Sequence, residues 1–184
     1  MKITDLLKPQ SILLNASPTN KADAIYTLGD LMDKGGNLSD KAEYLEAVFA
    51  REESGSTGLG DGIATPHAKS AGVKEAGLAA MVVPNGVDFD ALDGQPSRLF
   101  FMIAAPEGAN DTHLAALAEL SKYLMQDGFA DRLRKVTSPD EVIAAFNTGE
   151  EEAQAEEAKK AQAVKEAASS DKPLIVAVTA CTTG

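Results

Sequence analysis

Hydrophobic positions follow two spacings along most of the chain, one typical of helices and one typical of strands. Apolar residues recur every three or four positions in four segments, which predicts amphipathic helices. These segments are residues 20–34, 39–51, 113–125 and 138–146. Nearly continuous apolar runs at residues 77–83 and 99–104 predict buried strands, and shorter candidates lie at residues 12–14 and 63–65. Together they predict an α/β fold: a layered sandwich with a central mixed β-sheet of about five strands flanked by helices.

Each predicted helix is preceded by a residue suited to capping its free amides. These residues are Asn20, Ser39, Thr112 and Ser138. The helix that begins at His113 has an apolar stripe, which we expect to pack on the core. The side chains expected on that face are Leu114, Leu117, Leu120, Tyr123 and Leu124.

The composition changes after Phe146, where apolar anchors become sparse. Residues 149–171 are rich in Ala, Glu and Lys and predict a poorly packed linker that is helical in part. Residues 172–184 read as a strand that runs into a loop around Cys181. The predicted organisation is therefore a folded domain over residues 1–148, the linker, and a short final segment that is too small to be a domain.

Composition narrows the possible environments and partners. The chain has 184 residues, with 28 acidic against 17 basic ones and a net charge of −11. This charge disfavours nucleic acid and anionic membrane surfaces, and a basic protein partner fits it better. No apolar run reaches the roughly 18 residues of a membrane span, and a single cysteine excludes an internal disulfide. We expect a cytoplasmic protein without direct membrane insertion.

The most informative segment is the glycine-rich loop that ends in His67. Its glycines permit backbone angles closed to other residues, while Pro66 fixes its own φ and holds Thr65 extended. The imidazole is therefore held in place. Because imidazole is largely neutral and nucleophilic near pH 7, a rigid histidine suits phosphoryl relay chemistry. The simpler alternative is a hydrogen-bonded loop histidine without chemistry.

Two other binding chemistries deserve comparison. The glycines do not form a Gly-x-x-x-x-Gly-Lys-Ser/Thr motif and lack the strand-then-helix context of a dinucleotide site. His67 and His113 with Asp61 or Asp111 contain suitable metal-ligand types, but no closely spaced ligand pair supports such a site. We therefore predict neither a cofactor nor a metal.

Residues 51–67, from Arg51 through the glycine-rich loop to His67, resemble the signature of the fructose/mannitol-type IIA domains of the bacterial phosphoenolpyruvate-dependent sugar phosphotransferase system. Residues 111–118, with His113, resemble the second histidine element of that family. The resemblance covers about the first 148 residues. Thr65 stands where the family often has an aliphatic residue, and a β-branched residue keeps the same extended shape there.

The resemblance implies a phosphoryl carrier with a phosphohistidine intermediate. His67 would accept phosphate from the phosphocarrier protein HPr and pass it to a cysteine of a IIB domain, which phosphorylates the sugar during uptake through a membrane IIC domain. Arg51 aligns with an active-site residue, and a guanidinium can engage two phosphate oxygens. His113 aligns with another, and near a helix start it would stay neutral and orient His67 or its phosphate. By themselves, without the family pattern, Arg51 and His113 are better interpreted as ordinary helix-end residues.

Residues 172–184 resemble the first strand and phosphocysteine loop of a fructose-type IIB domain, with Thr182 in place of the usual proline. Cys181 would then be the next phosphoryl acceptor in a longer protein, associated with the membrane through a IIC domain. The alternative is an unstructured tail with an inert thiol. Fructose is the sugar that the resemblance favours, while mannitol and other hexoses stay open. A regulatory phospho-acceptor of the nitrogen-related branch, without sugar transport, is the other function to consider.

Overall fold

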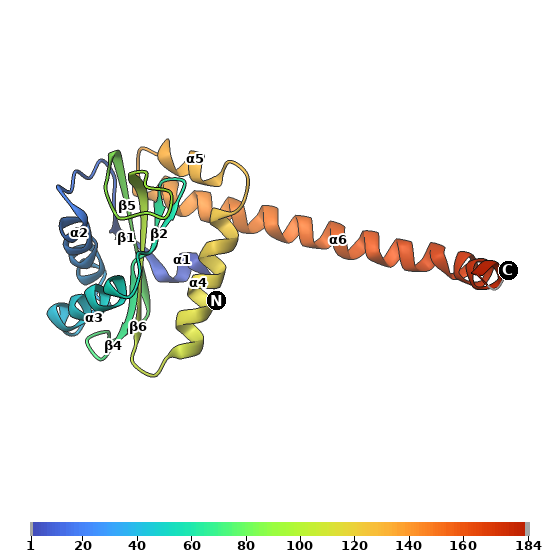
Figure 1. Cartoon of the computed structure of the whole chain (residues 1–184), viewed down its shortest axis with the longest axis horizontal. Helices are drawn as coiled ribbons and strands as arrows, with labels where there is room; N and C mark the ends of the chain where they lie inside the picture. The colour runs from blue at the N-terminus through green and yellow to red at the C-terminus, as the bar shows by residue number, and fades with distance from the viewer. Residues whose placement is uncertain (1, 183–184) are drawn as a thin grey trace. The chain divides into compact units, whose positions relative to one another are not determined.

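The computed structural model describes the backbone of residues 2–182 and the side chains of residues 2–167. The chain forms two compact units, Met1–Asn147 and Thr148–Gly184, which are described separately. The first unit contains a sheet with helices on both faces (Figure 1).

The sheet has six strands and is mixed, and the sequence predicts a mixed sheet. Its order is β1 (Leu7–Leu13), β5 (Gly77–Val87), β6 (Ser97–Pro106), β3 (Ile63–Ala64) and β2 (Gly58–Gly60), with β4 (His67–Ser70) also pairing with β6. The β5–β6 and β2–β3 pairs are antiparallel, and the others are parallel. The sequence predicts about five strands. Strands β2 and β4 have no apolar run to reveal them, because they are short and lie within the glycine-rich segment and directly after Pro66.

Helices α2 (Lys21–Lys34) and α3 (Lys41–Glu53) cover one face of the sheet, and α1 (Ile3–Leu6), α4 (Asn110–Leu124) and α5 (Phe129–Arg134) lie on the other (Figure 1). Strand β6 separates two cores because its side chains alternate between the faces. Phe100 and Met102 join the cluster under α2 and α3, whereas Phe101 and Ile103 join the cluster under α4 and α5. The buried start of α6 (Pro139–Thr182), including Phe146, completes the second core.

The predicted helices are present, but two of their predicted caps are wrong. Asn20 caps α2 as expected, since its side chain accepts a hydrogen bond from the Asp23 amide at 2.8 Å. Asp40 rather than Ser39 caps α3. Helix α4 begins at Asn110, two residues before the expected cap Thr112, and has no side-chain cap. When several polar residues precede a helix, the one that caps it depends on the path of the preceding loop. The local sequence does not specify that path, so a predicted helix start can be wrong by one or two residues.

The expected core face of α4 is correct except at its start. Leu120 and Tyr123 are buried, and Leu117 and Leu124 pack partly against the core. Leu114 is 64% exposed, so its placement in the core is wrong. The buried stripe of α4 runs through His113, Ala116, Leu120 and Tyr123, and the residue after His113 therefore lies outside it, toward solvent.

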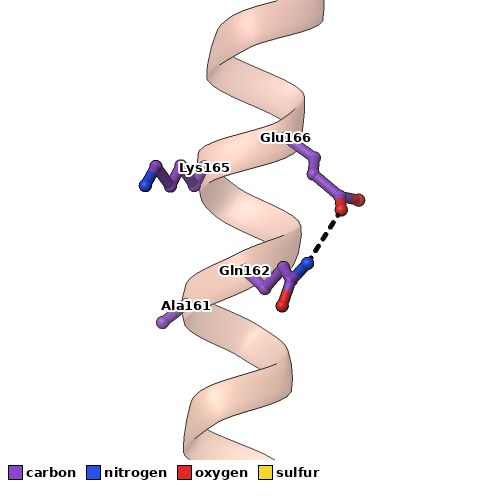
Figure 2. Close-up of a pocket in the computed structure, with 4 residues that line it drawn as sticks. All are labelled: Ala161, Gln162, Lys165 and Glu166. Carbon is purple, nitrogen blue, oxygen red and sulfur yellow. Dashed lines mark hydrogen bonds between the residues drawn. The ribbon is translucent and has the colours of Figure 1, made fainter.

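The second unit consists of the rest of α6, which continues from Thr148 to Thr182. Exposed side chains four residues apart form hydrogen bonds along this helix. For example, the side-chain amide of Gln162 donates to the Glu166 carboxylate at 3.2 Å (Figure 2). Such pairs each stabilise a helix by only a few tenths of a kcal/mol. Among the described residues, the hollow here is lined by Ala161, Gln162, Lys165 and Glu166, all on this one helix.

The strand expected after residue 172 is absent from the described backbone, which is helical through Thr182. A lone strand leaves its amides and carbonyls without partners, whereas a helix pairs them within the segment. The side chain of Cys181 lies outside the described side chains, and the resemblance of this segment to a IIB domain stays a prediction. Within the described part of the chain, no helix is both long and apolar enough to span a bilayer.

Candidate functional site

His67 is the first residue of β4, directly after the glycine-rich segment. The turn before it uses the expected glycine conformations, with φ of 99° at Gly60 and 78° at Gly62. The Pro66 carbonyl accepts a hydrogen bond from the Ile103 amide at 3.1 Å, and His67 pairs with Ile103 in the sheet. The histidine is therefore fixed to the central strand of the domain, which confirms that its backbone is held.

The ring of His67 is oriented by its own loop. Its Nδ1 lies 2.8 Å from the carbonyl oxygen of Thr65. A carbonyl only accepts hydrogen bonds, so Nδ1 carries the proton and Nε2 keeps its lone pair. This arrangement directs an unprotonated, nucleophilic nitrogen away from the backbone.

His113, on α4, lies beside His67. The two ring centroids are 5.1 Å apart and the rings are tilted by 44°. His113 is only 9% exposed, and its Nε2 has no hydrogen-bond partner among the described residues. A buried polar atom without a partner is costly, so a ligand that paired with Nε2 would be favoured here.

Both histidines are held neutral at pH 7. Burial lowers the pKa of His67, and the nearby Arg51 lowers it further, against the opposing effects of the Thr65 hydrogen bond and Glu52. Burial also lowers the pKa of His113, with smaller contributions from His67 and Lys69. A neutral His67 is the nucleophilic form, and a neutral His113 can donate one hydrogen bond without adding a positive charge.

Arg51 stands in the last turn of α3, close enough to His67 to affect its pKa. Its Nη1 donates to Ser54 Oγ at 3.1 Å and to the Gly55 carbonyl at 2.9 Å. These bonds hold the guanidinium at the start of the loop that leads to His67. Three predicted site residues from separate segments, Arg51, His67 and His113, are thus brought together.

Two charged residues near the site are not among the sequence predictions. Glu52 is a buried carboxylate at the end of α3, and Lys69 follows His67 by two residues on β4. Alternation along a strand places Lys69 on the His67 side, which is a usable signal. An acid in the last turn of a helix opposes the helix dipole, and this was the only local signal for Glu52.

In the described part of the chain, no group of three or more His, Cys, Asp or Glu side chains could hold a metal ion. Asp111 and Asp61, the acids considered as further metal ligands, are both exposed to solvent. Asp111 is exposed in the first turn of α4, and the amide of the exposed Asp61 donates to the side chain of Asp93 at 3.0 Å.

Comparison with known proteins gives a consistent result. Residues 5–149 match the family model described as phosphoenolpyruvate-dependent sugar phosphotransferase system, EIIA 2. The fructose-specific EIIABC component of Bacillus subtilis is 46% identical over 147 residues, which cover 80% of this chain and 23% of that protein. The 2-O-alpha-mannosyl-D-glycerate-specific EIIABC component of Escherichia coli is 32% identical over 100% of this chain and 27% of that protein. The chain thus spans about a quarter of the length of these two relatives.

Solved structures agree with this result. The nitrogen regulatory protein IIA-Ntr of Neisseria meningitidis has a TM-score of 0.72 at 38% identity, covering 78% of this chain and 98% of that one. The chain belongs to the EIIA type 2 family of the phosphoenolpyruvate-dependent sugar phosphotransferase system. A phosphotransferase role follows in general terms from this membership.

Proposed function

We propose that the chain is a phosphoryl carrier in which His67 Nε2 accepts the phosphate. The observation that carries the proposal is the bond between His67 Nδ1 and the Thr65 carbonyl, 2.8 Å long, which leaves Nε2 as the free nucleophile. The lowered pKa of His67 keeps the ring neutral near pH 7, with its one proton on Nδ1. Nothing else in the site has to move a proton before the ring can attack phosphorus.

The transfer begins with attack of Nε2 on the phosphorus of a phosphorylated donor. A new N–P bond forms on His67 as the donor's own bond to phosphorus breaks, and the Nδ1 proton stays in place, so the ring becomes cationic. Such transfers depend mainly on positioning and on stabilising the charge of the phosphoryl oxygens. Arg51 would contribute a guanidinium and His113 its unpaired Nε2, as a hydrogen-bond donor to a phosphoryl oxygen. The proposed donor is HPr, as the resemblance to the fructose/mannitol-type IIA domains implies.

The proposed acceptor is the cysteine of a IIB domain, and Cys181 would be that cysteine. Support comes from the E. coli EIIABC relative, which aligns over the whole chain, including the segment around Cys181. The proposed sugar is fructose, because the fructose-specific relative shares 46% of the aligned residues. In such a protein a IIC domain would attach the carrier to the membrane.

A regulatory carrier of the nitrogen-related branch is the second candidate, with a specific observation in its favour. IIA-Ntr of N. meningitidis is 38% identical to this chain, and the match covers 98% of that protein. The whole-chain match to an EIIABC component favours the sugar-transport function over it.

Incubation with phosphoenolpyruvate, enzyme I and HPr tests the carrier function. We expect one acid-labile, base-stable phosphoryl group per chain, lost in His67→Ala and retained in His113→Ala. Labelling of His67→Ala would refute the assignment. Addition of a separate fructose-type IIB domain then distinguishes the two branches, since only a sugar-transport carrier should discharge onto its cysteine.

A further inference from the structure

The residue after Arg51 in the last turn of α3, Glu52, is a buried carboxylate. Glu52 is only 8% exposed, and both its oxygens accept from the Thr57 amide at 3.2 Å. The Thr57 hydroxyl also donates to it. Lys21 of α2 approaches to 3.0 Å and so pairs with the charge from the other side.

Hydrogen bonds connect this carboxylate to His67. The Thr57 carbonyl accepts from the Thr65 amide at 3.0 Å, and the Thr65 carbonyl accepts from His67 Nδ1 at 2.8 Å. Glu52 thus holds Thr57, the Thr57 carbonyl holds the Thr65 amide, and the Thr65 carbonyl faces His67 Nδ1. This series fixes the position of the acceptor that orients the ring, while the charge of Glu52 acts on His67 directly and raises its pKa.

Packing alone does not account for a charge at this position. Burial of a carboxylate costs several kcal/mol unless it is paired and hydrogen-bonded, and the last turn of a helix disfavours an anion. The Lys21 side chain is shared, since it also approaches Asp90 at 3.3 Å and lies 4.9 Å from the centre of the Phe89 ring. The negative charge is thus retained at an unfavourable position by Thr57 and by a lysine that Glu52 shares with Asp90.

We propose that Glu52 is a positioning residue for His67: through Thr57 and Thr65 it fixes the Nδ1–H form of the ring and stabilises the imidazolium that develops as Nε2 binds phosphorus. This rests on the proposed carrier function. During acceptance the donor's bond to phosphorus breaks, the bond to Nε2 forms, and the ring gains one positive charge while its Nδ1 proton stays in place. When the phosphate leaves, its bond to Nε2 breaks with the electron pair returning to nitrogen, and the ring is neutral again.

The charges around the ring are consistent with this role. Arg51 lowers the pKa of His67 and Glu52 raises it, both from α3, while the neutral His113 faces the ring from α4. Glu52 thus offsets the effect on the His67 pKa of the Arg51 guanidinium, which the proposed function assigns to the phosphate. Lys21, from α2, limits how strongly Glu52 acts.

The test replaces Glu52 by Gln, which keeps an acceptor for the Thr57 amide and removes the charge. Glu53→Gln is the matched control, because Glu53 is the next residue of the same helix and is exposed. Two quantities are measured on the full chain: the pKa and tautomer of His67 by NMR, and the single-turnover rate of phosphoryl transfer from phosphorylated HPr. We expect Glu52→Gln to lower the pKa of His67 and to slow acceptance about tenfold, equivalent to about 1.4 kcal/mol in the barrier.

Unchanged His67 titration, with a rate within about twofold of wild type, would overturn the proposal. If Glu52→Gln does not fold, Thr57→Val removes one of the donors to the carboxylate and should shift both quantities the same way by a smaller factor. Failure of wild type to accept phosphate overturns the carrier function instead. The NMR titration needs no phosphate and still decides whether Glu52 controls the ring.

Discussion

Replacement of His113 by Ala tests whether this residue assists phosphoryl transfer or only stabilises the fold. In the unliganded protein its Nε2 is buried and has no partner among the described residues. An unmet hydrogen bond of this kind costs about 1–3 kcal/mol. If a phosphoryl oxygen supplies the missing partner only during transfer, loss of His113 raises the barrier by that amount. The rate should then fall roughly 5- to 150-fold.

The free energy of unfolding should fall by less than it does for an ordinary truncation in the core. Removal of the ring leaves a cavity, but it also removes the buried atom that lacks a partner. These terms oppose each other, so the free energy of unfolding should fall by less than the roughly 3–5 kcal/mol of a large-to-small aromatic change in a core. His67 keeps its bond to the Thr65 carbonyl and its pairing with Ile103, so it should still accept phosphate in this variant.

Quenched-flow measurement of single-turnover transfer, from phosphorylated HPr to His67 and from His67 to a IIB domain, gives the rates, and thermal unfolding gives the stability. Leu117→Ala serves as the control, since Leu117 is a partly buried residue of the same helix and packs on the core. It should lower the melting temperature and leave transfer unchanged. A His113→Ala protein that transfers within about threefold of wild type would refute the reasoning.

Two further predictions concern the tail and pH. Truncation after Gly149 should leave the melting temperature and His67 labelling nearly unchanged, because the compact first unit ends at Asn147; a melting temperature many degrees lower would contradict this. The lowered pKa values of His67 and His113 mean that the unfolded chain binds protons more readily than the folded one below about pH 6.5. Stability should therefore fall as the pH drops below that value, and urea unfolding of wild type and the double His→Ala variant should show a smaller decrease in the variant.

Local sequence was sufficient for much of the fold and for the fixed placement of His67. Amphipathic spacing predicted α2, α3 and α4, and apolar runs predicted β5 and β6, because a period of hydrophobicity depends only on near neighbours. The glycine-rich loop predicted a fixed His67, since the backbone limits of Gly and Pro are also local. The resemblance of two motifs then indicated the family.

Tertiary structure decided what depends on residues distant in sequence. The strand order, the short strand β4 and the 5.1 Å approach of His113 to His67 all require pairing across tens of residues. Glu52 pairs with Lys21 because α2 and α3 lie against each other, so an ordinary acidic residue in the sequence becomes a buried, paired charge that affects His67. A side chain's chemical type is set by the sequence, but its pKa and partners are set by what surrounds it, and only folding brings those surroundings together.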